Sequence, residues 1–435
     1  MISIIFGYNR NIDRYSMWHF KTKYKTKNIN RQYLTGMLII CLMQCIRPYY
    51  LCSQDTVFID INKALEIAFG NNNNFNYLAN KTLANKYTSE YPTDLNIDYG
   101  QLYTENPVLK LELIQNLGTP GHNKNERNSR AILEDFEKQK LALSKKQVEI
   151  EIKSLYLHWL YQMNVLQNIE LKKEYSQKLI HVANVRNELG DTEFVELAKS
   201  QNQLSALEFE YQAYLIDIDI TENKLRKYLG ITEKLVPRNT KLELYMISKV
   251  SDTSDFNSNY FTDISGTNYK LAENNTKLIR TEKLPKFEVG MTYQKEYSPN
   301  SFNLLSIHAG ISMPIFDKAL KESEEKAQIQ ADFALQKLQH EKFGYALEIQ
   351  NTILELDKIF LQTRHFENYE IPAANLILST TTSQYQKEAI DFEEYMEKVN
   401  EALKIKRAYL DVINSYNQTA LKLELFTKPY PNDEM

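Results

Sequence analysis

Two glutamates near the C-terminal end of the chain have the strongest case for chemistry. Glu394 and Glu397 are three residues apart, a spacing that places both carboxylates on one face of a helix. Neighbouring carboxylates attract cations and raise each other's pKa through like-charge repulsion. The alternative is a solvated acidic face, formed by Glu393, Glu394 and Glu397 on the outside of a helix.

The rest of the sequence offers no second cluster of reactive residues. It contains no nucleophile motif, phosphate-binding loop or catalytic dyad, and we therefore predict that the chain is not an enzyme and holds no cofactor or metal. His158 and Trp159 lie together in a long helical segment and are interpreted as packing residues. His308 alternates with apolar residues in a predicted strand and is interpreted as a polar residue of its inner face.

Glu394 belongs to a segment that occurs twice, each time between two long helical stretches. The two copies align at a constant offset of 198 residues. Because internal repeats take precedence over local patterns, we predict two copies of one unit of about 190 residues. Glu196 is then the counterpart of Glu394. The matching pairs are Phe194 with Phe392, Glu196 with Glu394, Asn202 with Asn400 and Tyr211 with Tyr409.

These repeats set the expected organisation of the chain. We predict an export segment over 1–54, a first unit over 55–250, a second unit over 251–427 and a tail over 428–435. Each unit contains a helix, a β-hairpin and two long helices joined by a tight turn. The hairpins are expected at 93–117 and 286–315, and the turns near 188–192 and 386–391.

Long stretches without glycine or proline indicate unusually long helices. From about Lys124 to Asn187, apolar residues recur every three or four positions, which predicts one helix about 96 Å long at 1.5 Å per residue. A globular domain has no use for a helical hairpin of this length, whereas a tube or a coiled coil does. Pro372 lies inside another such helix and is expected to kink it. Further helices are predicted at 59–91, interrupted at 71–74, and at 192–229, 258–283, 318–386 and 391–426.

Apolar and polar residues alternate along both predicted β-hairpins, for example at Leu95 and Ile97 in the first and at Ile307 in the second. Four strands are too few to close a barrel, and open strand edges cannot exist in hydrocarbon. Three chains would supply twelve strands and close one, with apolar residues toward lipid and polar residues toward water. The alternative is two ordinary surface hairpins, each packing its apolar face on a helix.

The N-terminal residues read as an export signal. A basic stretch ending at Arg31 precedes an apolar run from Leu34 to Ile46, which is too short for a comfortable membrane span. Met17 and Met37 are alternative starts, and a signal anchor in the inner membrane is the alternative to a cleaved signal. All three cysteines lie in this region, which excludes a disulfide framework or a cysteine metal site in the rest of the chain. One of them, Cys52, is a candidate for lipidation.

The order of these features resembles the TolC family of outer-membrane efflux ducts over about residues 58–427. The similar features are the opening segment Ile61–Ala68, the strand, proline and helix around Pro314, Pro372 within a helix, and both turn segments. Residues 94–101 and 117–120 resemble a subgroup that serves heavy-metal pumps. The second turn departs from the family pattern, because Glu388 stands in place of a glycine.

The resemblance implies a mainly α fold with a small β part, assembled as a homotrimer. Each trimer would form a twelve-stranded β-barrel in outer-membrane lipid and a long periplasmic α-barrel. It would dock on a periplasmic adaptor of the membrane-fusion type and on an inner-membrane efflux pump, expected to be of the RND type. The acidic pair Glu394 and Glu397, with Glu196, would face the lumen near its entrance. The docking turns would contain Gly190, Asp191, Thr192, Glu388, Ala389 and Ile390.

A second class of protein stays open at this point. A periplasmic coiled-coil adaptor or scaffold would also have long helical hairpins, and it would have no membrane barrel. Adaptors typically carry one hairpin that flanks a small β domain, whereas this sequence predicts two hairpins and two strand pairs. The net charge of −4 gives no general attraction to nucleic acid, so no such partner is expected.

Overall fold

The helices are long because the sequence rarely interrupts them. In the computed structural model, α4 runs from His122 to Glu188 and α5 from Phe194 to Leu229, close to the predicted bounds. Gly230 directly follows α5 and has a φ of 68°, a conformation that favours glycine and ends the helix. The structure describes residues 56–71, 93–100, 106–188, 194–247, 259–297, 303–315, 317–387 and 389–428.

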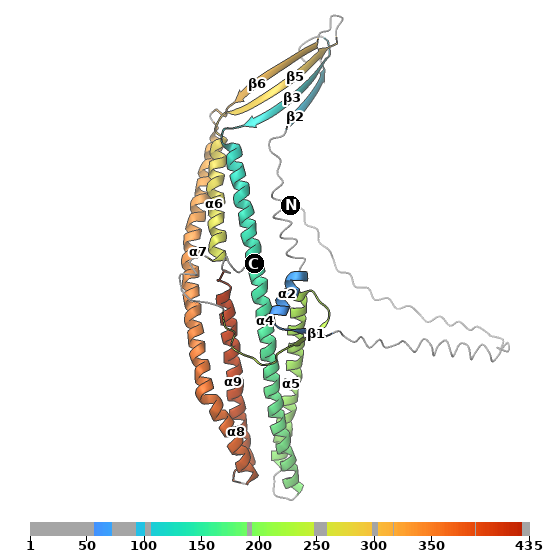
Figure 1. Cartoon of the computed structure of the whole chain (residues 1–435), viewed down its shortest axis with the longest axis vertical. Helices are drawn as coiled ribbons and strands as arrows, with labels where there is room; N and C mark the ends of the chain where they lie inside the picture. Colours follow the sequence, from blue (N-terminus) through green and yellow to red (C-terminus); the bar gives the residue numbers. More distant parts are fainter. Residues whose placement is uncertain are drawn as a thin grey trace, which may run out of the picture. The chain divides into compact units, whose positions relative to one another are not determined.

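The second half of the chain contains α6 (Tyr260–Thr281), α7 (Lys318–His365), α8 (Ile371–Gln386) and α9 (Phe392–Glu424). The helical stretch predicted over 318–386 is present with the same bounds, but a π-helical segment, η2 (Phe366–Glu370), separates α7 from α8 within it. Pro372 lies in the first turn of α8, where its missing N–H donor is tolerated. The expected change of direction is visible there (Figure 1). Among the described residues, no helix combines the length and apolar character that crossing a membrane requires.

Two short strands pair near the start of the described chain. β1 (Thr56–Ile59) and β4 (Lys234–Pro237) are parallel neighbours, with Phe58 opposite Val236. The predicted helix over 59–91 therefore begins later, because Ile59 belongs to β1 and α2 spans Ile61–Asn71. Asp60 precedes α2 and accepts a hydrogen bond from the backbone N–H of Lys63 at 2.8 Å, as a helix N-cap does.

The four alternating strands form one antiparallel sheet in the order β2-β3-β5-β6. β2 (Thr93–Gly100) and β3 (Val108–Gly118) form the first hairpin, and β5 (Lys286–Glu296) and β6 (Asn303–Ser312) form the second. The pairing of β3 with β5 joins the two hairpins. β6 ends at Ser312, before the predicted boundary at 315.

The passage from the sheet into the helices is a tight turn in the first half of the chain. Gly118 and Gly121 have φ values of 71° and 79°, which a residue with a side chain rarely adopts. α4 begins directly after this turn, and the His122 Nδ1 atom lies 3.0 Å from the Thr281 Oγ1 atom at the end of α6. This contact ties together the helices that lead from β3 and into β5.

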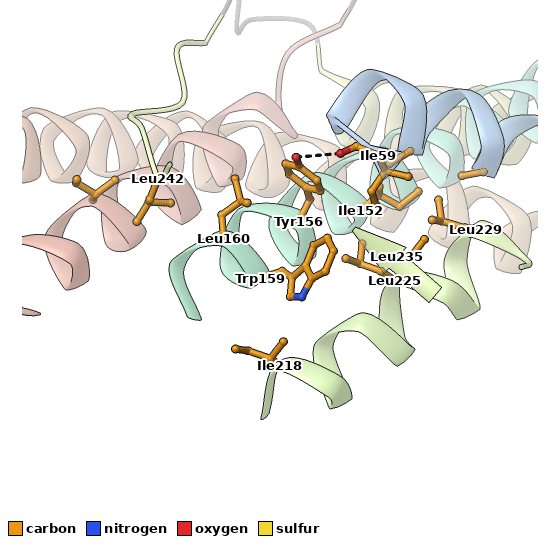
Figure 2. Packing of buried hydrophobic residues seen from close by; sticks show 13 residues of the cluster. Ile59, Ile152, Tyr156, Trp159, Leu160, Ile218, Leu225, Leu229, Leu235 and Leu242 are labelled. Carbon is orange, nitrogen blue, oxygen red and sulfur yellow. Dashed lines mark hydrogen bonds between the residues drawn. The ribbon is translucent and has the colours of Figure 1, made fainter. Parts of the chain in front are cut away.

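The main hydrophobic core lies where α2, α4, α5 and the short parallel strands meet (Figure 2). Trp159 is only 1% exposed and packs edge-on against Tyr156. Its burial agrees with the interpretation of Trp159 as a packing residue. The Tyr156 hydroxyl also donates a hydrogen bond to the Ile59 carbonyl at 3.4 Å, which links α4 to β1. The other fully buried members of this cluster include Ile152, Leu225, Leu229 and Leu235.

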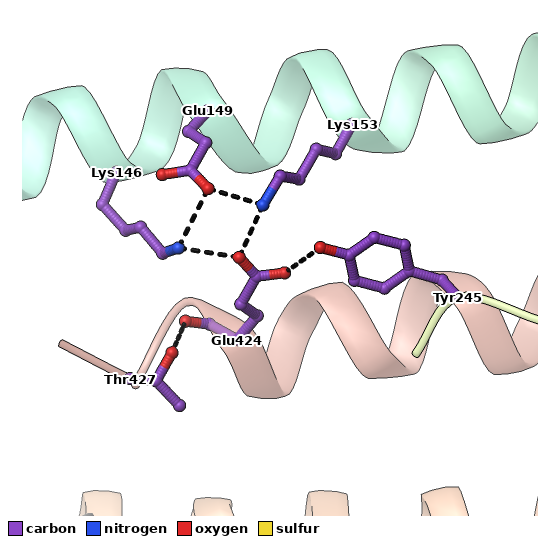
Figure 3. Close-up of polar contacts among 6 residues, drawn as sticks. All are labelled: Lys146, Glu149, Lys153, Tyr245, Glu424 and Thr427. Carbon is purple, nitrogen blue, oxygen red and sulfur yellow. Dashed lines mark hydrogen bonds and ion pairs between the residues drawn. The ribbon is translucent and has the colours of Figure 1, made fainter. Parts of the chain in front are cut away.

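A buried ionic cluster fastens the end of α9 to the middle of α4 (Figure 3). The Glu424 carboxylate accepts hydrogen bonds from Lys146 at 2.8 Å and Lys153 at 2.6 Å, and Glu149 contacts the same two lysines. Tyr245, from the segment before α6, donates to Glu424 at 2.7 Å. Burial alone would raise the pKa of Glu424, but these hydrogen bonds outweigh it and lower the pKa to about 2. Glu424 is therefore ionised throughout the neutral range.

Candidate functional site

The four-stranded sheet has one continuous apolar face. Because side chains alternate along a strand, residues that face each other across the sheet share a face. Ile307, at the centre of β6, is 83% exposed, and its neighbours on this face are also largely uncovered. An exposed apolar surface of this extent marks a contact with a partner or with lipid. Its two central cross-strand rows are Leu95, Leu113, Met291 and Ile307, and Ile97, Leu111, Tyr293 and Leu305.

The opposite face of the sheet is polar. Glu112 in β3 accepts hydrogen bonds from Lys110 at 3.0 Å and from Thr292 in β5 at 3.3 Å. His308 lies on this face, with its Nε2 atom 3.8 Å from Glu112, as the sequence interpretation of His308 predicts. Gly290 makes room for it, because a Cβ atom at that position would lie 2.4 Å from the imidazole ring. The sheet therefore separates an apolar surface from a polar one.

Both outer strands of the sheet have a free edge. β2 pairs only with β3, and β6 pairs only with β5, within the described part of the chain. A strand edge exposes unpaired N–H and C=O groups, which readily pair with another strand. β2 and β6 are at opposite ends of the strand order. The free edge of β6 in one copy of the chain can therefore pair with the free edge of β2 in another.

The predicted acidic pair lies in the first turns of α9. Asp391 caps the helix by accepting a hydrogen bond from the Glu394 backbone N–H at 2.8 Å. Glu394 and Glu397 are both exposed, but the Glu394 carboxylate lies 2.6 Å from the Lys398 ammonium. This ion pair was not predicted from the sequence, although its spacing of four residues is a recognisable helical signal. These three residues together carry a net charge of −1.

The other predicted site residues are placed only in part. Gly190, Asp191, Thr192 and Glu388 lie outside the described residues, as does the side chain of Glu196. Ala389 donates its backbone N–H to the Gln384 carbonyl at 2.9 Å. Ile390 packs against the hydrophobic cluster of α4, α8 and α9 that includes Tyr395 and Leu403. The described residues of the second turn are therefore anchored to the helices on either side.

A cluster around Arg407 joins three helices and was not identified from the sequence. Arg407 of α9 contacts Tyr161 of α4 at 3.0 Å and Tyr214 of α5, and its Nε atom lies 3.1 Å from Asp411. The Tyr161 hydroxyl donates to Asp411 at 2.7 Å. Burial and this carboxylate raise the pKa of Tyr161 to about 12, so the hydroxyl stays protonated and the contact is kept.

Comparison with solved structures identifies the fold. The outer-membrane channel OprN superposes with a TM-score of 0.72 at 13% identity, over 84% of this chain and 89% of that one. The CmeC outer-membrane channel of Campylobacter jejuni gives 0.69 at 12% identity, over 84% and 85%. CusC, solved in a study of transmembrane channel formation, gives 0.66 at 13% identity, over 86% and 94%. No protein-family model matches the sequence, and no curated protein matches it significantly. The predicted resemblance is thus confirmed for the fold.

Proposed function

We propose that this protein is the outer-membrane duct of a tripartite efflux pump, a passive channel that extends into the periplasm. The observation that carries the proposal is the sheet, which is apolar on one face, polar on the other and open at both edges. A sheet of this kind suits a membrane only when it closes into a barrel, with the apolar face toward lipid. Four strands therefore require further copies of the chain.

The outer surface of α7 supports assembly with other copies. Six of the exposed large apolar residues on this helix lie within roughly 80° of one another around its axis, at 100° per residue. The opposite face of α7 is buried, for example at Ala331 and Ile359. A helix that is apolar on both faces needs a second partner. The six residues that share this sector are Ile329, Phe333, Phe343, Leu347, Leu354 and Leu361. We call them the α7 stripe.

α5 has a matching exposed surface. Phe209 is 78% exposed, and Ile216 and Ile220 lie on the same side of the helix. The opposite side packs into the core through Leu225 and Leu229. The exposed apolar surfaces of α5 and α7 therefore differ from each other. When unlike surfaces of successive copies pack together, the copies form a closed ring if their relative rotations add up to a full turn. We propose that the α7 stripe packs against α5 of the next copy in a homotrimer.

Mass measurement of the full-length protein in mild detergent tests this proposal. We expect three copies, and we expect the protein to fractionate with the outer membrane as heat-modifiable material. A stable monomer, or protein that fractionates with the soluble periplasm, would contradict the duct and favour a periplasmic adaptor or scaffold. An adaptor or scaffold without a membrane barrel would leave the exposed apolar face of the sheet unexplained.

The partners follow from the same proposal. The turn between α8 and α9, with Ala389 and Ile390, and the predicted docking residues 190–192 would contact a periplasmic adaptor and, through it, an inner-membrane pump of the RND type. The solved channels of this fold support a duct, and the pump would choose the substrate. Heavy-metal ions are one candidate substrate class, beside drugs and other molecules, on the sequence resemblance of residues 94–101 and 117–120 to a subgroup that serves heavy-metal pumps.

The acidic pair offers a test at the level of single side chains. We propose that Glu394 and Glu397 face the lumen at the start of α9. Replacing both by glutamine changes the net charge of the group with Lys398 from −1 to +1. We therefore expect Glu394→Gln with Glu397→Gln to reverse or abolish cation preference in planar bilayers. The effect should weaken with salt, because the Debye length is about 8 Å at physiological ionic strength.

Lys398→Gln is the matched control for this experiment, because it removes the positive charge and should increase cation preference. Trimer mass should be the same in all variants, since exposed charges contribute little to stability. Unchanged selectivity in both the double variant and the lysine variant would show that these side chains face outward.

A further inference from the structure

A cavity of 270 Å³ lies between α4, α5 and α9, about two helical turns from the acidic pair. Its floor is apolar, because Ile169 is 4% exposed and Leu403 is 2% exposed. Its polar lining consists of three cationic side chains, two amides and one carboxylate. These residues are Lys172, Lys404 and Arg407, Asn168 and Asn400, and Glu210.

The positive charge in this cavity is not balanced by the groups around it. Lys172 and Lys404 form no ion pair within the described residues, and Glu210 is the only carboxylate in the lining. Arg407 is already paired with Asp411. The lining therefore has a surplus of one positive charge even when every acidic partner is counted. Unpaired cations beside an apolar floor attract oxygen-bearing anions.

Arg407 is held in place before any ligand arrives. Its guanidinium group lies between the rings of Tyr161 and Tyr214, 5.6 Å and 5.2 Å from their centroids. Its Nε and Nη2 atoms make the contacts with Asp411 and the two tyrosines, whereas Nη1 has no hydrogen-bond partner among the described residues. A fixed guanidinium with free donors binds an anion at a smaller entropic cost than a mobile one.

Asn400 provides a second unsatisfied group. Its Oδ1 atom is buried and has no hydrogen-bond partner in the structure. A buried polar atom without a partner is unfavourable, so a ligand or its water shell that donated a hydrogen bond to Asn400 would remove this penalty. Because an amide can turn to present either its oxygen or its nitrogen, Asn400 can serve both a protonated and an ionised oxygen.

We propose that this cavity is a binding site for a small oxyanion, with Lys172, Lys404 and Arg407 as its charged ligands. Phosphate and carboxylate groups both match the chemistry of the lining. The charged ligands come from α4 and α9, so the bound anion bridges the α4–α5 hairpin to the α8–α9 hairpin. Because it binds this arrangement of helices, the anion stabilises it. The proposal does not depend on the channel function.

Titration calorimetry on the full-length protein in detergent tests the site, with inorganic phosphate and citrate as probes and chloride at matched ionic strength as the blank. We expect saturable binding of phosphate or citrate below about 10 mM, and the stronger probe identifies the preferred oxyanion class. Lys172→Gln with Lys404→Gln should weaken binding by at least about tenfold, which corresponds to 1.4 kcal/mol.

Two matched variants separate binding from a structural effect. Glu210→Gln removes the only negative charge of the lining and should tighten binding several-fold. Lys145→Gln removes an exposed lysine elsewhere on α4 and should leave binding unchanged. The proposal is wrong if neither probe binds below about 10 mM, or if the double lysine variant binds as the natural protein does.

Discussion

Glu424→Ala is expected to lower the free energy of unfolding by about 3 kcal/mol at neutral pH, because it removes one of the two carboxylates that pair with Lys146 and the buried Lys153. Glu149 keeps its contacts with Lys146 and Lys153, but it must then balance both charges alone. Tyr245 also loses the acceptor of its hydroxyl. Urea unfolding of the detergent-solubilised protein, followed by helical circular dichroism, measures the change. Glu401→Ala, at an exposed position of the same helix, should have almost no effect.

The lowered pKa of Glu424 also predicts how the stability of the folded chain depends on pH in the acidic range. The pKa of Glu424 falls from its ordinary value of 4.5 to about 2 in the folded chain. Its stabilisation is therefore complete above pH 4.5 and is lost as the pH falls toward 2, by about 3 kcal/mol in total. Glu424→Gln cannot titrate and should lack this part of the acid dependence. Parallel loss of stability in both proteins between pH 5 and 2 would show that the cluster does not depend on the charge of Glu424.

The helices and strands could be predicted where a single local signal determined them. α4 follows from the absence of glycine and proline after Gly121, and the sheet faces follow from alternation. Local sequence signals failed where contacts with residues far away in the sequence determine the secondary structure. β1 and β4 have four residues each and pair across most of the first half of the chain, so neither has a pattern of its own. The π-helical turn before Pro372 was missed for a different reason, because proline predicts a disturbance without predicting its form.

In the candidate site, too, residues on one helix could be predicted from the sequence, whereas contacts between helices could not. The carboxylates at Glu394 and Glu397 could be identified from spacing on one helix, and the Lys398 partner was available from the same rule. The Arg407 cluster and its neighbouring cavity take residues from three helices that are far apart in the sequence. Neither the hydrophobic periodicity nor any sequence motif predicts which faces of α4, α5 and α9 pack together. A site of this kind depends on tertiary packing, so it needs the structure.

Replacing Phe333 and Leu347 by aspartate is expected to abolish the proposed trimer. Both residues belong to the α7 stripe, are exposed in the single chain and make no contribution to its core. Each would bury an apolar side chain in every subunit contact, worth about 1.5–3 kcal/mol per side chain, and a buried aspartate there would be strongly unfavourable. Mass measurement in mild detergent should then give one copy, while circular dichroism of the helices stays unchanged.

The control places the same two charges on another part of the same helix. Gln330→Asp with Gln339→Asp alters exposed positions outside the α7 stripe, so three copies should persist. A trimer that survives in the Phe333 and Leu347 variant would mean that α7 faces solvent or another partner, and that the copies meet elsewhere. A monomer in both variants would point to the added charge rather than to the stripe. Only loss of the trimer in the first variant alone supports packing of α7 against α5 of the next copy, which would bring the free edges of β6 and β2 together to close the sheet.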